Sequence, residues 1–463
     1  MNVITNESFY DVIVIGGGNA GLNAAIVARE KGATVLVVES APRLMRGGNS
    51  RHVRNFRCKH DHPLGVLKGH YTSERYIADL ISVTEGDTNL ELAKMLVERS
   101  ENCYQWFLDR GVRFQSALRG TLQLSHSNAF FLGGGKALLN TLYDYAKRIG
   151  VNFTYDSKVT ELDIEELTLS SMAIEINDNM EKFYCGAVVL SSGGFQGNTE
   201  WLKEIWGAAA DNFIIRGTPY DDGMILKAMI DANAATVGSP KQCHAIAVDA
   251  RSPKFDGGIV TRVDCITHGI VVNDDAIRFY DEGEDFWPKR YAIWGKLIAE
   301  QKNQMAYVII DHKMIHEFLP TVLPPYQASS ITELAKIMRV SSEQLVETIE
   351  TFNESIHSSN FNHAVLDDCR TQGLTPEKSN WARKINEGPF YAYPLKPGIT
   401  FTYLGLKVNN KAQALSHDNR PFTNIYAAGE IMAGNVLGEG YIAGIGMTIG
   451  TVFGQIAGEH CYD

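Results

Sequence analysis

The 463-residue sequence lacks the features of a disulfide-stapled or nucleic-acid-binding protein. It has no CxxC pair, and its cysteines are odd in number, at positions 58, 103, 185, 243, 265, 369 and 461. This usage predicts a reduced, cytoplasmic compartment, without a disulfide framework or a structural metal site. Positive charge is in deficit, because 43 Lys and Arg face 54 Asp and Glu, which gives a net charge of −11. We therefore expect no nucleic-acid partner, although a local arginine cluster could still bind an anionic substrate.

Long apolar runs are also scarce. Residues 1–10 are polar, which predicts no secretory signal, and only residues 440–458 form a long run without charge. Glycines recur every fourth residue there, at 446, 450, 454 and 458. This spacing occurs in membrane helices, but it also lets a soluble helix bring its backbone close to a sheet or a cofactor. We predict a buried helix of a soluble protein.

The beginning of the chain carries a dinucleotide-binding pattern. An apolar strand over residues 11–15 leads into Gly16, Gly18 and Gly21, a helix follows, and a second strand over residues 34–38 ends at Glu39. Gly16 permits the tight turn, Gly18 lets the backbone approach a pyrophosphate, and Gly21 allows the helix to pack closely. The helix N-terminus attracts phosphates, and Glu39 can accept hydrogen bonds from ribose hydroxyls.

The rest of the chain predicts a nucleotide-binding domain that is split in sequence. A helical tract over about 74–110, a glycine turn at 133–135 with a helix to about 149, and a strand over 187–190 that runs into Gly194 continue the first part. Between residues 241 and 401 short strands and amphipathic helices alternate with proline-bearing joints. The strand-to-glycine pattern returns at residues 424–429. We predict an α/β fold in which a Rossmann-like domain (1–240 and 402–463) carries an inserted α+β capping domain (241–401).

At these residues the chain resembles the flavoproteins of the fumarate reductase and succinate dehydrogenase family. The shared segments are 16–21, 47–50, 242–244, 278–282 and 424–434. Within the family it looks most like the FAD-dependent tricarballylate dehydrogenases, through residues 45–57, 128–136 and 278–290. The resemblance implies a split FAD domain with a cap, and a substrate bound between them.

The resemblance also implies the cofactor and the residues that hold it. FAD would be wrapped by segments from both ends of the chain. Asn49 stands where some members carry a histidine that links FAD covalently, so a non-covalent flavin is implied. The implied FAD-binding residues are Gly16, Gly18, Ala20, Gly21, Glu39, Gly48, Asn49, Ser50, Gly194, Gly429 and Glu430.

The catalytic assignments rest on the same resemblance. In the family, the substrate loses a hydride to flavin N5 while an arginine exchanges a proton with the neighbouring carbon. Arg290 matches that arginine, His244 a substrate-binding histidine and Thr261 a substrate-contacting threonine. The interval from Arg278 to Arg290 is four residues longer than the family's usual pattern, so Arg290 is a candidate, and the alternative is a surface arginine beside Lys289.

Other departures concern charge. Arg262 stands at a position of a family glutamate, Val436 replaces a carboxylate-binding arginine, and a second family histidine has no counterpart near residues 400–402. Arg262, together with Arg51, Arg54 and Arg57, predicts a more cationic site than a dicarboxylate needs. The three loop arginines could instead be solvated or contact FAD phosphates.

These observations predict oxidation of a saturated polycarboxylate, with tricarballylate to cis-aconitate as the preferred reaction. The resemblance implies that a membrane-bound electron-transfer protein reoxidises the flavin, which would place this chain at the inner face of the membrane through its partner. The alternatives are a fumarate- or urocanate-type reductase and a non-catalytic flavin-holding subunit. A 3-oxosteroid dehydrogenase fits less well, because the predicted pocket is cationic.

Overall fold

The computed structural model of the chain describes residues 8–116, 124–257, 261–357 and 360–463. Within this part, the larger sheet runs in the order β20-β21-β9-β1-β2-β6, and β7 and β8 extend it from β9. Its strands are β1 (Ser8–Ile15), β2 (Val35–Val38), β6 (Asn152–Thr154), β7 (Ser157–Glu165), β8 (Thr168–Ile176), β9 (Asn179–Leu190), β20 (Gln413–Leu415) and β21 (Pro421–Ala427).

The centre of this sheet is parallel, as the apolar runs predicted. β1 pairs with β2 in the register Val12↔Val35, and β21 from the C-terminal region pairs in parallel with β9. The strands are buried on both faces, which explains why they read as continuous Val and Ile runs. The split α/β fold is therefore confirmed, since one sheet is built from both ends of the chain.

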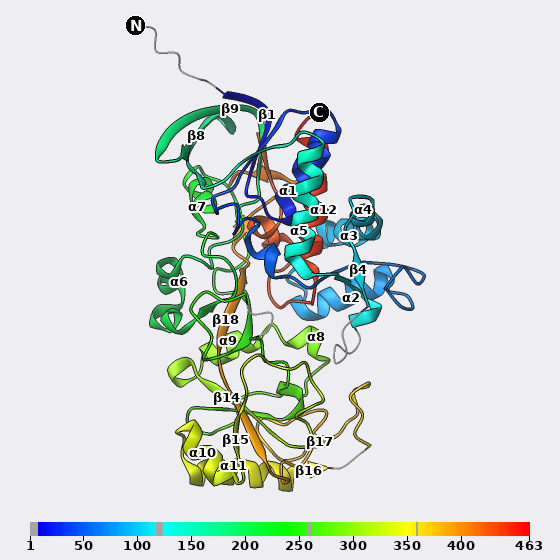
Figure 1. The fold of residues 1–463 in the computed structure, drawn as a ribbon, viewed down its shortest axis with the longest axis vertical. Coiled ribbons are helices and arrows are strands. Elements are labelled where there is room, and N and C mark those ends of the chain that lie inside the picture. Colours follow the sequence, from blue (N-terminus) through cyan, green and yellow to red (C-terminus); the bar gives the residue numbers. More distant parts are fainter. Residues whose placement is uncertain (1–7, 117–123, 258–260, 358–359) are drawn as a thin grey trace.

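Helix α12 (Ile445–His460) covers the sheet together with α1 (Asn19–Glu30) and α5 (Gly134–Arg148), and all three lie side by side in Figure 1. The glycine stripe of α12 faces α1: a Cβ at Gly454 would lie 2.4 Å from the Ala20 carbonyl oxygen, and one at Gly458 would lie 2.6 Å from that of Ala24. The close neighbour is thus a helix rather than the sheet. Among the described residues, no helix has the length and apolarity needed to span a membrane.

A second, mainly antiparallel sheet forms the lower half of the molecule in Figure 1. Its long strand β18 pairs with β10, β12, β14 and β15, and β13 pairs with β14. The bounds are β10 (Ile214–Ile215), β12 (Cys243–Asp249), β13 (Ile270–Asn273), β14 (Ala306–Asp311), β15 (Tyr326–Ala328) and β18 (Phe390–Thr402). β10 precedes residue 241, so the second sheet also draws on the first segment; the boundaries at 240 and 401 remain a prediction.

Helices of the second half lie at both ends of this sheet. α10 and α11 cover its far end, whereas α8 lies next to the first half (Figure 1). Their bounds are α8 (Trp287–Arg290), α9 (Trp294–Ala299), α10 (Ile331–Met338) and α11 (Ser342–Ser355).

The helical tract expected over about 74–110 is three helices. Glu85 adopts a left-handed φ of 51°, and the Asn89 side chain accepts hydrogen bonds from Glu91 N and Leu92 N, which starts a new helix. The remaining elements are α2 (Ser73–Thr84), α3 (Leu90–Ser100), α4 (Cys103–Asp109), α6 (Thr199–Trp206), α7 (Met224–Asp231), β3 (Asn55–Arg57), β4 (Phe114–Gln115), β5 (Asn128–Phe131), β11 (Thr236–Val237), β16 (Ile356–His357), β17 (Arg370–Thr371) and β19 (Gly405–Leu406).

Candidate functional site

A cavity of about 650 Å³ lies where the carboxyl ends of the parallel strands meet the second sheet. The loops after β1, β2 and β9 line one end, and residues from β12, α8 and β18 line the other. Open α/β sheets bind ligands at this edge, because successive strands deliver their loops there.

The first end of the cavity has the shape of a phosphate cradle. Gly16 has a φ of +101°, and a Cβ on it would lie 2.4 Å from the Ser191 carbonyl oxygen. Gly18 precedes α1 directly and lines the cavity, so the N-terminal end of that helix, where N–H groups lack intrahelical partners, faces it. Gly21 does not line the cavity; a Cβ there would lie 2.0 Å from the Gly16 carbonyl oxygen, so its role is close packing.

Glu39 lies at the end of β2, where a ribose is expected. Its carboxylate accepts hydrogen bonds from the backbone N–H of Gly17 at 3.3 Å, Ala41 at 3.0 Å and Gly47 at 2.9 Å. Burial raises the pKa of Glu39, and these backbone donors oppose that rise. The side chain therefore orders the glycine turn and the 47–50 loop around itself while it lines the cavity.

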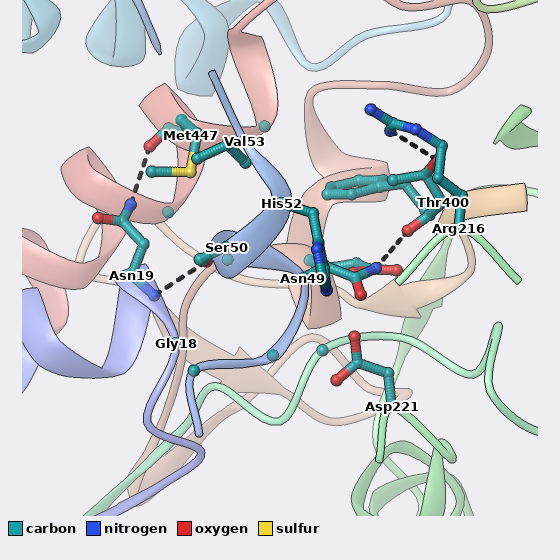
Figure 2. A pocket seen from close by; sticks show the side chains of 18 of the residues that line it. Gly18, Asn19, Asn49, Ser50, His52, Val53, Arg216, Asp221, Thr400 and Met447 are labelled. Carbon is teal, nitrogen blue, oxygen red and sulfur yellow. Dashed lines mark hydrogen bonds between the residues drawn. The ribbon is translucent and has the colours of Figure 1, made fainter. Parts of the chain in front are cut away.

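The loop that contains Asn49 and Ser50 closes over this end, as Figure 2 shows. Ser50 Oγ accepts a hydrogen bond from Asn19 N at 3.1 Å, next to Gly18. Asn49 Nδ2 donates to the Thr400 carbonyl oxygen at 2.6 Å, and Asn49 Oδ1 accepts from Thr218 N at 2.9 Å. Asn49 thus joins the first sheet's loops to β18 of the second.

Two buried carboxyl groups, those of Asp221 and Glu430, line the cavity. Gln196 Nε2 donates to Asp221 Oδ2 at 2.8 Å and to Glu430 Oε2 at 3.4 Å. Burial raises the pKa of Glu430 to about 8, and burial together with the Glu430 charge raises that of Asp221 well above its ordinary range. Gly194 is tightly packed here, since a Cβ on it would lie 2.4 Å from Glu430 Oε1. Asp221, Gly429, Glu430 and Ala20 line the cavity.

His244, on β12, marks the second end of the cavity. Its ring is buried and stacks on Tyr441, with ring centroids 4.0 Å apart. Burial and the charges of Arg216 and Arg262 hold the pKa of His244 well below its usual value, so the ring is neutral at pH 7. Neither ring nitrogen has a hydrogen-bond partner among the described residues. A buried polar group of this kind, on the wall of a cavity, calls for a polar ligand.

Three arginines converge beside His244. Arg54, Arg216 and Arg262 all line the cavity, and Arg262 lies over the Tyr291 ring at 4.9 Å. Arg216 Nη1 donates to Thr400 Oγ1 at 3.0 Å. Burial, reinforced by the charge of Arg262, lowers the pKa of Arg54 to about 9 and that of Arg216 to about 10. Positive charges that are buried together favour an anion between them.

Asp264 pairs with two of these arginines. Arg262 Nε lies 2.6 Å from Asp264 Oδ1, and Arg262 Nη2 donates to Asp264 Oδ2 at 2.7 Å. Arg54 Nη2 lies 4.0 Å from Asp264 Oδ2 and has no hydrogen-bond partner among the described residues. Burial tends to raise the pKa of Asp264, but Arg262 and Arg54 bring it below its ordinary value.

The other predicted site residues lie outside the cavity wall. Thr261 donates its hydroxyl hydrogen bond to Asp256, and Arg290, on α8, lies 3.0 Å from Glu284 through Nη2. Arg51 donates to the Leu44 carbonyl oxygen, and Arg57 is buried against Tyr71 and Asp79. Of the three loop arginines, the structure therefore brings only Arg54 to the cavity.

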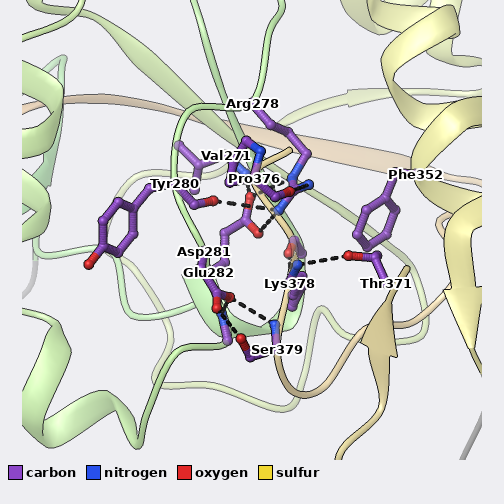
Figure 3. A network of polar contacts seen from close by, with 12 residues as sticks. Val271, Arg278, Tyr280, Asp281, Glu282, Phe352, Thr371, Pro376, Lys378 and Ser379 are labelled. Atoms are coloured by element: carbon purple, nitrogen blue, oxygen red, sulfur yellow. Dashed lines mark hydrogen bonds and ion pairs between the residues drawn. The ribbon is translucent and has the colours of Figure 1, made fainter. Parts of the chain in front are cut away.

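The segment that leads to α8 is held by a separate polar network (Figure 3). Arg278 and Glu282 form a buried ion pair, with Nη2 2.6 Å from Oε2, and Glu282 Oε1 also accepts from Val271 N at 2.8 Å. Buried Lys378 donates to the carbonyl oxygens of Thr267 at 2.9 Å and Gly269 at 2.6 Å. The Arg278 and Glu282 of the predicted motif thus brace the chain between β13 and α8.

The geometry of the cavity agrees with the similarity of this chain to known proteins. Residues 11–446 match the family model described as "FAD binding domain". The chain belongs to this FAD-binding family. The glycine cradle, Glu39 and the cavity fit FAD, and the prediction of this cofactor is confirmed.

Individual relatives are distant. The NADH:fumarate oxidoreductase of Klebsiella pneumoniae is 25% identical over 97% of this chain, which spans 47% of that protein. A flavocytochrome c3 fumarate reductase in its open conformation is similar in fold, with a TM-score of 0.75, 20% identity, and coverage of 98% of this chain and 78% of that one. The 3-ketosteroid Δ1-dehydrogenase of Sterolibacterium denitrificans has a TM-score of 0.77 at 17% identity, with coverage of 98% and 99%.

Sequence reasoning did not find several residues of the cavity. Arg216, Asp264, Tyr291 and Tyr441 line it, yet none belongs to a local motif. The available signals were indirect: Asp264 stands two residues after Arg262, Tyr291 directly follows Arg290, and Tyr441 lies in the uncharged run over residues 440–458.

Proposed function

We propose that this chain oxidises a saturated polycarboxylate, with tricarballylate to cis-aconitate as the preferred reaction. The observation that carries the proposal is the second end of the cavity, where Arg54, Arg216 and Arg262 meet around a single paired carboxylate, Asp264. The buried, unpartnered nitrogens of Arg54 and His244 supply donors that only a polar ligand would satisfy.

Each residue has a distinct task in this proposal. Arg54 and Arg216 bind carboxylates of the substrate, and neutral His244 donates a hydrogen bond without adding charge. Bound FAD would accept the hydride equivalent of the substrate C–H bond. Arg262 keeps one edge of its guanidinium on Asp264, so only its other edge can face a third carboxylate.

Arg290 remains the proposed proton-transferring residue. It lies on α8 next to Tyr291, which does line the cavity, and its Nε is buried without a hydrogen-bond partner among the described residues. Its Nη2 is held by Glu284, which also accepts from the Tyr280 hydroxyl at 2.8 Å. For Arg290 to act, its side chain must leave Glu284 and turn toward the cavity when substrate binds.

A reductase of an unsaturated acid is the second candidate. The similarity to fumarate oxidoreductases supports it, and the same arginines would bind fumarate or cis-aconitate. A steroid substrate has no carboxylate for them, so the structural likeness to a ketosteroid dehydrogenase supports only the fold. The membrane-bound partner that reoxidises the flavin also remains a proposal.

The test is anaerobic mixing of the yellow protein with candidate acids. Tricarballylate should bleach the flavin absorption near 450 nm, succinate should do so more slowly, and cis-aconitate or fumarate should reoxidise reduced protein if flux runs the other way. A bound flavin that no acid can reduce or reoxidise would refute the proposal in favour of a non-catalytic subunit.

A pair of matched variants shows whether the arginine cluster is the binding site. Arg54→Gln should weaken the binding of tricarballylate by about 10- to 150-fold, because a charge-assisted hydrogen bond is worth about 1.5–3 kcal/mol. Arg51→Gln makes the same change in the same loop, but Arg51 contacts the Leu44 carbonyl oxygen outside the cavity, so it should change binding little. Equal effects of the two variants would contradict the assignment.

A further inference from the structure

Asp264 is an unexpected residue in a cavity that must bind an anion. Its side chain is 8% exposed and lines the cavity together with the arginines that would hold the substrate. Trp287, on α8, donates its indole N–H to Asp264 Oδ1 at 2.8 Å. One carboxylate therefore contacts Arg262 and the cap helix, and lies within ion-pair distance of Arg54.

This arrangement fixes the charge that the substrate meets. The ion pair with Arg262 is close and uses both carboxylate oxygens, whereas the approach of Arg54 is long, at 4.0 Å. The negative charge of Asp264 thus reduces the net positive charge of Arg54, Arg216 and Arg262 by one unit. His244 adds none, since it is neutral.

We propose that Asp264 is a specificity-determining residue, whose negative charge limits how strongly the cavity prefers a tricarboxylate over a dicarboxylate. This inference rests on the proposed function, and it gives Asp264 a role in selecting among polycarboxylates. An anion bound to Arg54 Nη2 at about 3 Å would lie within about 7 Å of Asp264 Oδ2. At an effective dielectric constant of about 20, a like charge at 7–10 Å weakens binding by more than tenfold. Asp264 repels each carboxylate of the ligand, so an acid with one more carboxylate has its binding weakened once more.

The decisive variant is Asp264→Asn, which removes the charge but keeps an oxygen that can accept from Trp287. Binding of citrate and malate, which carry three and two carboxylates, is measured at pH 8 from the perturbation of flavin absorption in the FAD-loaded protein. The citrate-to-malate ratio of association constants should rise at least tenfold in Asp264→Asn. Turnover of tricarballylate relative to succinate should shift in the same direction.

The matched control is Asp285→Asn. Asp285 lies just before α8 and pairs with Lys289 at 3.3 Å, but it does not line the cavity. Its variant should leave the citrate-to-malate ratio unchanged. Asp264→Glu, which keeps the charge, should also stay within threefold of the native ratio. An unchanged ratio in Asp264→Asn, or a change of similar size in Asp264→Glu, would overturn the inference.

Failure of the variants to fold and failure of the proposed function would give different results. Asp264→Ser is a second neutral variant; if both neutral variants fail to fold while Asp264→Glu folds, the charge serves only to hold Arg262 and α8, and the inference is wrong. If tricarballylate does not reduce the native flavin, the proposed function fails, but the citrate-to-malate ratio still tests Asp264 independently.

Discussion

The buried carboxyl group of Glu430 should make the stability of this protein fall as the pH rises. Its pKa is raised by burial from 4.5 to about 8. Above pH 4.5 the unfolded chain releases this proton, whereas the native protein keeps it until about pH 8. The native state then binds more protons than the unfolded state, so the free energy of unfolding decreases with pH across this window. The replacement Glu430→Gln keeps the shape of the side chain and removes this dependence.

The size of the effect follows from the shift. The rise in the pKa of Glu430 from 4.5 to about 8 sets a ceiling of about 5 kcal/mol on the loss of unfolding free energy over the whole window. Between pH 7 and pH 8 alone, where the proton begins to leave the native state, the loss is about 1 kcal/mol. Buried histidines have the opposite effect at lower pH. Burial lowers the pKa of His52 to about 4 and holds that of His244 well below its usual value, so the free energy of unfolding decreases as the pH falls below about 6.5. Above pH 7 these histidines contribute little, but the pKa of Asp221 is also raised by burial, so the effect of Glu430 is read from the difference between the native protein and Glu430→Gln.

The assay is urea unfolding at saturating FAD, at pH 7.0, 7.5 and 8.0. The native protein should lose about 1 kcal/mol of unfolding free energy that Glu430→Gln retains. Glu459→Gln is the control, because Glu459 is 40% exposed and pairs with Arg99 at the surface; it should keep the native slope. If Glu430→Gln shows the native slope too, Glu430 is ionised in the folded protein, and the reasoning from its burial is refuted.

Three other predictions concern the flavin and the proton. Acid precipitation should release the flavin into solution, because the Asn49 amide cannot form a histidyl link; flavin that stays with the polypeptide would contradict this. Gly21→Ala should lower the free energy of unfolding by about 3 kcal/mol and deplete bound FAD, because its Cβ would lie 2.0 Å from the Gly16 carbonyl oxygen. An A450/A280 absorbance ratio equal to that of the native protein would argue against this packing role. Arg290→Lys should lower kcat about 10²- to 10⁴-fold with FAD binding unchanged, whereas near-native turnover would move proton transfer to another residue.

Much of the cofactor end of the site could be predicted from the sequence, because it depends on local geometry. The spacing of Gly16, Gly18 and Gly21 between two apolar strands allows few structures other than a tight turn into a helix, and Glu39 follows from the length of the second strand. The Asn424–Gly429 pattern likewise indicated a strand of the same sheet, and β21 does pair with β9.

The break in the helical tract could also have been found, since Glu85-Gly86 and the cap at Asn89 are local signals. The periodicity of the apolar residues on either side obscured them. By contrast, the direction in which the glycine stripe of α12 faces is not a local property. It depends on the approach of α1, which lies more than 400 residues earlier in the chain.

The second end of the cavity, which is the proposed substrate end, was decided by the tertiary structure alone. Arg54 and Arg57 belong to the same basic run, yet Arg54 reaches the cavity and Arg57 is buried against Tyr71 and Asp79. Arg216 comes from a loop beside β18, and Asp264 from the segment before β13, so no spacing in the sequence relates them. The sequence by itself determined that this chain holds a dinucleotide, because backbone turns and glycine contacts are set by neighbouring residues. Which charges meet the substrate was determined by the packing of two sheets, because electrostatic interactions act across space between residues that are distant in sequence.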